Sequence, residues 1–132
     1  MPAWSIRLLL LFGAVTAGAL ALAILFLSGP FYAGYSIETD GKVSLLNELK
    51  APALLLLSLG LVQGAGVVWA GWLRHGLLAG ALLYLTFGLS RIIAVLSDGP
   101  PSSALLRVMA VELLFGLLFG LALWRQRRAG AG

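Results

Sequence analysis

The sequence predicts an all-α integral membrane protein: a single membrane domain folded as an antiparallel bundle of four transmembrane helices. The first observation is composition, because 61% of the 132 residues are hydrophobic and only 11% are charged, whereas soluble domains carry about 25% charged residues. The second is that apolar residues form continuous runs of the ~20 residues that a helix needs to cross the hydrocarbon core. Continuous runs rich in Leu and Ala favour helices over a barrel, whose strands alternate between apolar and polar residues.

Four such stretches are predicted to span the membrane, and together they leave no room for a soluble domain. They are residues 8–27, 51–73, 76–96 and 104–124, with residues 28–50 as an outer loop.

The spans are delimited by residues that interrupt helices or connect them tightly. Gly29 and Pro30 end the first span. Ser44 is placed to cap a helix that runs from the outer loop into the second span. We expect Pro52 to kink that helix or to mark its true start, because proline cannot continue the hydrogen-bond ladder. The later connections are short, so the second, third and fourth spans should be antiparallel neighbours.

The basic residues indicate orientation. They lie before the first span, between the second and third, and after the fourth, which by the positive-inside rule places both termini in the cytoplasm. These residues are Arg7, Arg74, Arg125, Arg127 and Arg128. Aromatic residues near the two predicted boundaries are typical of interfacial belts. They are Trp4, Trp69, Trp72 and Trp124 on the inner side, and Phe31, Tyr32 and Tyr35 on the outer side.

Several functions are excluded or disfavoured by residue content. The chain has no cysteine and one histidine, which excludes thiol chemistry, disulfides and bis-histidine haem in a single chain and predicts no metal site. The net charge of +4 comes largely from residues that flank the spans, so it indicates membrane orientation and no nucleic-acid partner.

Small residues spaced four apart predict close helix packing, either within the bundle or in a homo- or hetero-oligomer. The pairs are Gly60 and Gly64, Gly76 and Gly80, and Gly116 and Gly120. Gln63, in the second span, is expected to make a hydrogen bond between helices.

Two opposite charges, Arg91 and Glu112, lie inside the third and fourth apolar stretches. A charge at membrane depth costs about 2.5–3.5 kcal/mol, so it rarely stays there without a partner or a function. Arg91 lies about 10 Å and Glu112 about 13 Å below the same outer turn, at 1.5 Å per residue. Because side chains lean toward the N-terminus of their own helix, the two should converge in the outer half of the bilayer.

The pair defines a candidate outward-facing pocket. Tyr84 and Asp98 recur at seven-residue spacing from Arg91 and share its helix face, and the polar segment before the second span could cover the opening. Such a pocket suits an amphipathic molecule, with its head on the charges and its tail among the helices: a lipid-like molecule, a quinone or an isoprenoid. The candidate ligand-binding residues are Arg91, Glu112, Tyr84, Asp98, Asn47, Glu48 and Lys50.

An alternative function remains open at this stage. A buried Arg–Glu pair also fixes helix register, and the protein would then be a structural or accessory subunit of a larger membrane complex. For acid–base catalysis, Glu112 is the candidate buried acid and Tyr84 is a candidate proton donor. The sequence assigns no catalytic residue, substrate or cofactor. A proton-coupled exporter is disfavoured, because the acid lies in the fourth span beside an arginine.

The polar positions, read in order, are Asn47-Glu48-Leu49-Lys50-Ala51, Gly88–Arg91, Asp98-Gly99-Pro100-Pro101-Ser102 and Glu112. This pattern resembles a family of small four-span bacterial membrane proteins known only as a domain of unknown function. The resemblance covers nearly the whole chain and implies a four-helix protein of the bacterial inner membrane. It implies no substrate or catalytic residue.

Overall fold

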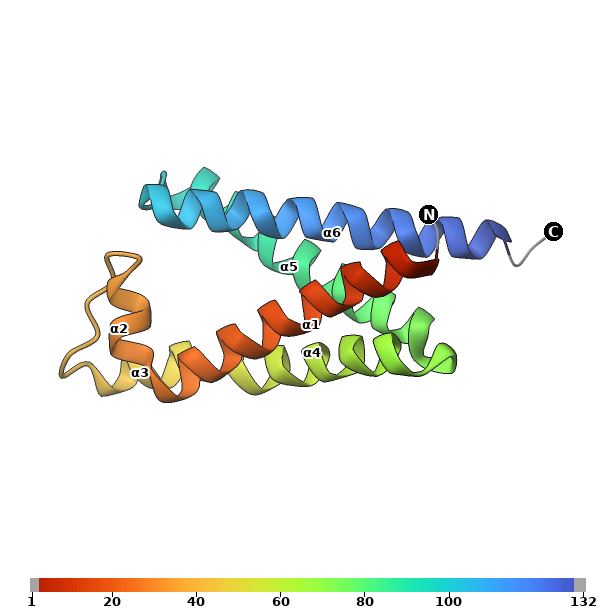
Figure 1. Ribbon diagram of the computed structural model, residues 1–132. Coiled ribbons are helices and arrows are strands. Elements are labelled where there is room, and N and C mark those ends of the chain that lie inside the picture. The colour runs from red at the N-terminus through yellow and green to blue at the C-terminus, as the bar shows by residue number, and fades with distance from the viewer. Residues whose placement is uncertain (1–2, 130–132) are drawn as a thin grey trace.

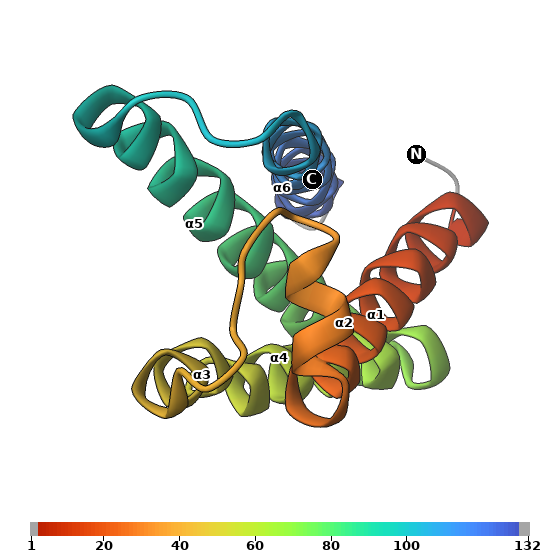
Figure 2. The same ribbon diagram turned by 90° about the vertical axis from the view of Figure 1, so that its left-hand side faces the viewer.

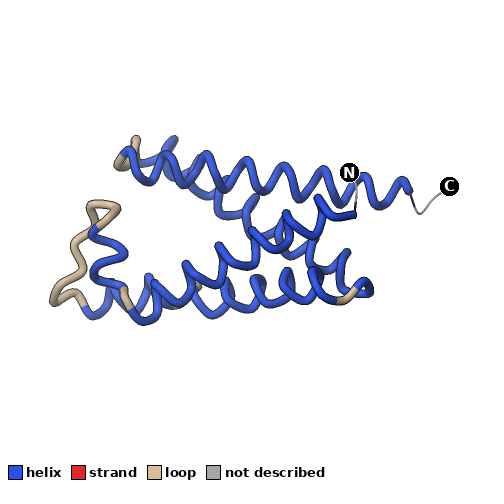
Figure 3. Tube along the Cα trace, in the orientation of Figure 1, coloured by secondary structure: helices blue, strands red, loops and turns tan. Residues whose placement is uncertain are grey.

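The computed structural model describes residues 3–129, and every regular element in this range is a helix. The elements are α1 (Ala3–Phe26), α2 (Ser28–Ala33), α3 (Val43–Lys50), α4 (Ala53–Val68), the 3₁₀ helix η1 (Ala70–Trp72), α5 (Leu73–Asp98) and α6 (Ser103–Ala129). Four helical stretches are long and apolar enough to cross a membrane. They are Ala3–Phe26, Val43–Val68, Ala70–Asp98 and Ser103–Arg128. Non-helical segments lie at the ends of the molecule (Figure 3).

Pro52 interrupts the second of these stretches. Helix α3 ends at Lys50 and α4 begins at Ala53, with a turn between them, because the proline ring removes a backbone donor and clashes with the preceding helical turn. The predicted break is therefore confirmed. The predicted cap is wrong: α3 already begins at Val43, and no side chain caps its N-terminus.

The long helices pack in two pairs. Helix α1 packs along α4, α5 packs along α6, and contacts between α4 and α5 join the pairs. The pairs diverge toward the end of the molecule that carries α2 and α3, here called the α2–α3 end (Figure 1). Figure 2 looks onto this end and shows α2 lying across it. The first turn of α1 and the last turn of α6 lie toward the opposite end (Figure 1).

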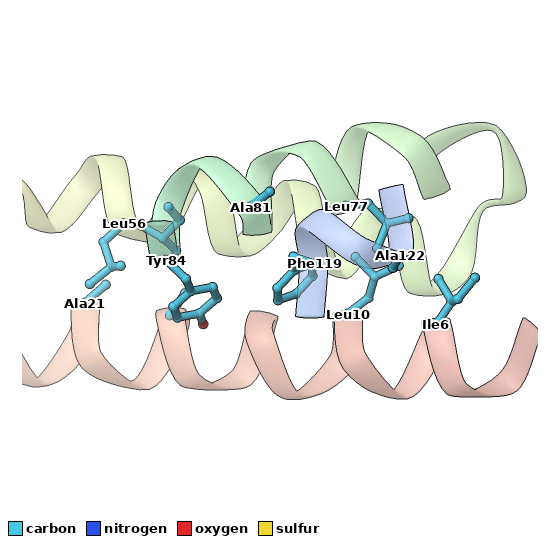
Figure 4. Close-up of a cluster of buried hydrophobic side chains, with 11 residues drawn as sticks. Ile6, Leu10, Ala21, Leu56, Leu77, Ala81, Tyr84, Phe119 and Ala122 are labelled. Carbon is cyan, nitrogen blue, oxygen red and sulfur yellow. The ribbon is translucent and has the colours of Figure 1, made fainter. Parts of the chain in front are cut away.

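Phe119 of α6 occupies the centre of the core. Its side chain is fully buried, as are Leu10 and Leu77 (Figure 4). A Cβ at Gly13 of α1 or at Gly80 of α5 would collide with the Phe119 ring. The two glycines therefore make the space that lets α6 insert an aromatic ring between α1 and α5.

The predicted small-residue faces are used largely inside the chain. A Cβ at Gly60 would lie 3.1 Å from the Cβ of Ala17 on α1, and a Cβ at Gly76 would lie 2.9 Å from Leu10 Cδ2. Gly60 therefore lets α1 approach α4 closely, and Gly76 lets α5 approach α1 closely. Gly120, by contrast, faces open space.

Gln63 of α4 is fully buried. Its Nε2 donates to the carbonyl oxygen of Leu59 on the same helix, at 3.3 Å. Its Oε1 lies against Gly13 of α1 and accepts no hydrogen bond among the described residues. The expected hydrogen bond between helices is therefore wrong: the amide nitrogen bonds a carbonyl oxygen of its own helix, and the amide oxygen is buried without a hydrogen bond.

Candidate functional site

Arg91 of α5 and Glu112 of α6 form a bidentate ion pair. Arg91 Nε donates to Glu112 Oε2 at 2.7 Å, and Arg91 Nη2 donates to Oε1 at 3.3 Å. Two parallel hydrogen bonds between planar groups fix their relative orientation and are stronger than bonds between neutral groups. The predicted convergence of the two charges is therefore observed.

The close approach of α5 and α6 next to the pair depends on two glycines. A Cβ at Gly88, one turn before Arg91, would lie 2.7 Å from Leu113 Cδ2 and 3.2 Å from Leu113 N. A Cβ at Gly116, one turn after Glu112, would lie 2.9 Å from Leu85 N. Each helix thus packs a leucine on the bare backbone of the other, which brings the charged side chains within direct reach.

The two partners differ in exposure. The side chain of Arg91 is 33% exposed and that of Glu112 is 12% exposed. Both carboxylate oxygens of Glu112 are bonded, whereas the pair uses Nε and Nη2 of Arg91 and leaves Nη1 outside it. A guanidinium has five N–H donors. The accessible side of this ion pair is therefore a hydrogen-bond donor.

Tyr84 belongs to the core. Its hydroxyl donates to the carbonyl oxygen of Gly13 at 2.7 Å. Its ring stacks on Phe119, with 5.7 Å between centroids and 13° between planes, and lies 5.3 Å from the Phe115 ring. Figure 4 shows the Tyr84 side chain reaching toward α1. This hydroxyl ties α5 to α1.

The remaining candidate residues lie at the α2–α3 end. Asp98 is the last residue of α5 and is exposed; Asn47 and Glu48 are exposed on α3, and Lys50 is half-buried where α3 ends. Hydrogen bonds and ion pairs of the described residues do not link any of the four to Arg91 or Glu112.

Tyr32 of α2 lies within electrostatic range of Arg91, and the sequence predicts for it only a place in an interfacial belt. Its hydroxyl donates to the carbonyl oxygen of Leu49 on α3, at 3.4 Å. Burial raises the pKa of Tyr32 above its usual value, while the positive charge of nearby Arg91 lowers it in part. The phenol therefore keeps its proton at neutral pH and lies within electrostatic range of the guanidinium. No pattern in the sequence signals that α2 folds back.

A second contact holds α2 on its other side. Ser102, in the connection between α5 and α6, donates from Oγ to the carbonyl oxygen of Tyr35 at 3.2 Å. The same Oγ accepts from the backbone N–H of Leu105 at 3.5 Å and caps α6.

The structure also has an open apolar depression, away from the ion pair. It is lined by Leu61, Val62, Ala65, Trp69 and Trp72, at the junction of α4 and η1. It offers no charged group. Within residues 3–129, no three His, Asp or Glu side chains lie together as metal ligands.

Comparison with protein families matches residues 5–123 to a domain of unknown function, DUF4345. The chain belongs to this family. The match includes both Arg91 and Glu112, and the resemblance drawn from the polar positions to a domain of unknown function is confirmed. Comparisons with curated proteins and with solved structures give no match. The family description states no activity, so the chemistry of the site carries the argument about function.

Proposed function

We propose that the chain is a multi-pass protein of the bacterial cytoplasmic membrane. In this proposal the four long helices form an antiparallel bundle with both termini in the cytoplasm, and the α2–α3 end faces outward. The support is the apolar length of the four helical stretches and the basic residues that flank them on one side. The function of the protein is to bind an amphipathic, lipid-like molecule, a quinone or an isoprenoid at the Arg91–Glu112 pair.

The unequal exposure of the two partners is the observation that carries this proposal. Glu112 is nearly buried and has both oxygens bonded, whereas a third of the Arg91 side chain is accessible. In a low-dielectric environment a guanidinium with accessible donors attracts oxygen atoms strongly. The head that fits carries hydrogen-bond acceptors: the phosphate of a lipid or isoprenoid, or the carbonyl oxygens of a quinone.

Apolar side chains lie one helical turn from the pair, on the same helix faces. They are Val95 on α5 and Val108 on α6, and both are partly exposed. A ligand whose head lies on Arg91 would place the start of its tail along these side chains, and burial of apolar surface would add to its affinity.

The test is ligand retention by the intact protein, purified gently and measured by native mass spectrometry. The probes are phosphatidylglycerol, which presents a phosphate, and decylubiquinone, which presents carbonyl oxygens. The double variant Arg91→Gln/Glu112→Gln removes both charges and leaves no charge unpaired. We expect wild type to retain phosphatidylglycerol or decylubiquinone. The fraction of the double variant that carries the probe should be about tenfold lower, which is the effect of one charge-assisted hydrogen bond.

Arg107→Gln is the matched control, because Arg107 is an exposed arginine on α6, the helix that carries Glu112, and its loss should leave retention unchanged. Retention of the acceptor probes by the double variant at the wild-type level would contradict the proposal. The probe that wild type retains distinguishes a lipid phosphate from a quinone.

The alternative, an accessory subunit, is favoured by the close crossing of α5 and α6 at Gly88 and Gly116, since a bidentate pair beside such a crossing also fixes register. That function predicts a stoichiometric protein partner in the native mass spectrum and no retention of either acceptor probe.

A further inference from the structure

The two helix pairs are each packed tightly, and they meet each other at the centre of the bundle. Within the pairs, α4 lies against α1 at Gly60 and α5 lies against α6 at Gly88. Between the pairs, the hydroxyl of Tyr84 on α5 donates to the carbonyl oxygen of Gly13 on α1, and the Phe119 ring fills the space beside Gly13. From this central contact the pairs diverge toward the α2–α3 end (Figure 1).

At the diverging end, one side-chain hydrogen bond joins the two pairs. Ser102, in the α5–α6 connection, donates from Oγ to the carbonyl oxygen of Tyr35, just after α2, at 3.2 Å; we call this the latch bond. Helix α2 belongs to the other pair, because it follows α1 and its Tyr32 hydroxyl donates to Leu49 O on α3. Among residues 3–129, the other hydrogen bond that crosses between the pairs is the central one, and neither α2 nor α3 packs extensively on α5 or α6.

The turn after α2 presents the carbonyl group of the latch bond in a strained backbone. The N–H of Ser36 donates to Ala33 O and that of Ile37 donates to Tyr32 O, both at 3.0 Å. This pattern is a Schellman motif, which places its C′ residue in the left-handed conformation. Ser36 has φ 63° and is the one non-glycine residue with positive φ in the described part of the chain. A side chain disfavours this conformation, which persists where surrounding contacts hold it. The latch bond is such a contact, because its acceptor is the residue directly before Ser36.

We propose that the latch bond is a releasable closure of the α2–α3 end. When it opens, the α1–α4 and α5–α6 pairs separate further at this end by rotating about the contact of Tyr84 with Gly13. Ser102 Oγ also accepts from the N–H of Leu105 at 3.5 Å, so rotation of the hydroxyl proton releases the carbonyl and keeps the cap of α6. Strain at Ser36 favours release, since the freed turn can leave the left-handed conformation.

This closure acts on the part of the bundle that carries the ion pair. Arg91 lies between Tyr84 and the end of α5 at Asp98, and Glu112 lies on α6, so both charges move with the same helix pair. Release therefore changes how far the ion pair stands from α1 and α4 and leaves its two hydrogen bonds intact. The inference goes beyond the proposed function, because the closure operates with or without a bound ligand.

The test measures the separation of the helix pairs with spin labels on introduced cysteines, since the chain has none of its own. Val43→Cys on α3 and Leu96→Cys on α5 report the α2–α3 end. Leu61→Cys on α4 and Leu117→Cys on α6 report the centre, because Leu117 lies two residues from Phe119. All four native side chains are exposed, so labels there disturb no packing. Distances are measured by double electron–electron resonance in the full chain.

The variant Ser102→Asp removes the donor of the latch bond and keeps an oxygen that caps α6. We expect mainly the shorter distance at the α2–α3 end in wild type. Ser102→Asp should raise the ratio of separated to closed molecules there about fivefold, the effect of one hydrogen bond, and leave the central distance unchanged. Ser102→Thr keeps the hydroxyl, and Ser103→Ala removes the neighbouring exposed hydroxyl; both should match wild type.

Wild-type distances in Ser102→Asp would overturn the inference. An equal widening in Ser103→Ala, or at the central labels, would show general loosening of the bundle and would overturn it as well. If the aspartate prevents folding, Ser102→Ala removes the same donor without adding a charge and must produce the same widening at the α2–α3 end.

Discussion

Gly88 of α5 lies directly against Leu113 of α6, so that a Cβ at position 88 would meet Leu113 Cδ2 at 2.7 Å. Gly116 of α6 meets Leu85 of α5 in the same way, at 2.7 Å from Cδ2 and 2.9 Å from the backbone nitrogen. Both contacts lie on the same side of the ion pair, because the partners follow in the order Arg91 with Glu112, Gly88 with Leu113 and Leu85 with Gly116. The separation of α5 and α6 is therefore set by bare backbone, and the Arg91–Glu112 geometry depends on it.

The first prediction concerns this crossing. In Gly116→Ala the new methyl group meets the backbone of Leu85, which cannot rotate away, so the helices must separate. Overpacking of this kind costs about 1–3 kcal/mol, and we expect a lower unfolding temperature in detergent. Gly120→Ala, one turn along α6 and facing open space, is the control. Its stability should equal or exceed that of wild type, because alanine favours helix. Equal behaviour of the two variants would contradict the role of the crossing.

The second prediction concerns the ion pair. Arg91→Gln leaves a nearly buried carboxylate without its partner, and we expect a loss of about 3 kcal/mol in the free energy of unfolding. Glu112→Gln should cost less, because the accessible guanidinium extends toward the surface. The double variant should be more stable than Arg91→Gln alone, with a coupling of about 1–3 kcal/mol from a double-mutant cycle. Additive losses would mean that the two groups do not depend on each other.

Much of this arrangement follows from the sequence, for identifiable reasons. The long helices are predictable because apolar runs of sufficient length admit few other structures in a bilayer. The Arg91–Glu112 pair is predictable because short connections place neighbouring helices side by side and helical rise fixes depth. The break before α4 is predictable because the ring of Pro52 removes a backbone donor and clashes with the preceding turn, whatever the tertiary packing.

Other features depend on tertiary packing and leave no local signal. Tyr84 shares a helix face with Arg91, yet its hydroxyl bonds Gly13 because the glycine backbone of α1 lies within reach. Ser44 has the right residue type for a cap, but α3 begins before it. The expected end of the first span at Gly29 and Pro30 is displaced: α1 ends at Phe26, the chain leaves the helical conformation at Leu27, and Gly29 and Pro30 lie within α2. The direction in which α2 continues has no local signal.

The third prediction concerns Gln63. Its buried Oε1 accepts no hydrogen bond from residues 3–129. An unsatisfied buried polar atom lowers the free energy of unfolding by about 1–3 kcal/mol. Gln63→Met keeps the length of the side chain and removes the amide. We expect stability in detergent to be unchanged or raised by about 1 kcal/mol. A clear loss of stability would show that the amide makes an interaction that its contact with Gly13 does not explain.

The fourth prediction concerns orientation in the membrane. The chain has no cysteine, so single introduced cysteines report their own location. Ser44→Cys, in the segment between α2 and α4, should react with a membrane-impermeant maleimide in intact cells. Gln126→Cys, near the end of α6, should react only after lysis. The reverse pattern would contradict the proposed cytoplasmic termini and place the Arg91 end of the bundle inside.

The measurement that tests the central claim most directly is ligand retention by the charge-exchanged variant Arg91→Glu/Glu112→Arg. A pair that serves only packing works in either direction, whereas a ligand site needs its guanidinium at the accessible position on α5. The account predicts an unfolding temperature close to that of wild type, together with loss of the phosphatidylglycerol or decylubiquinone that wild type retains. A stable exchanged protein that still retains the probe at the wild-type level would contradict it.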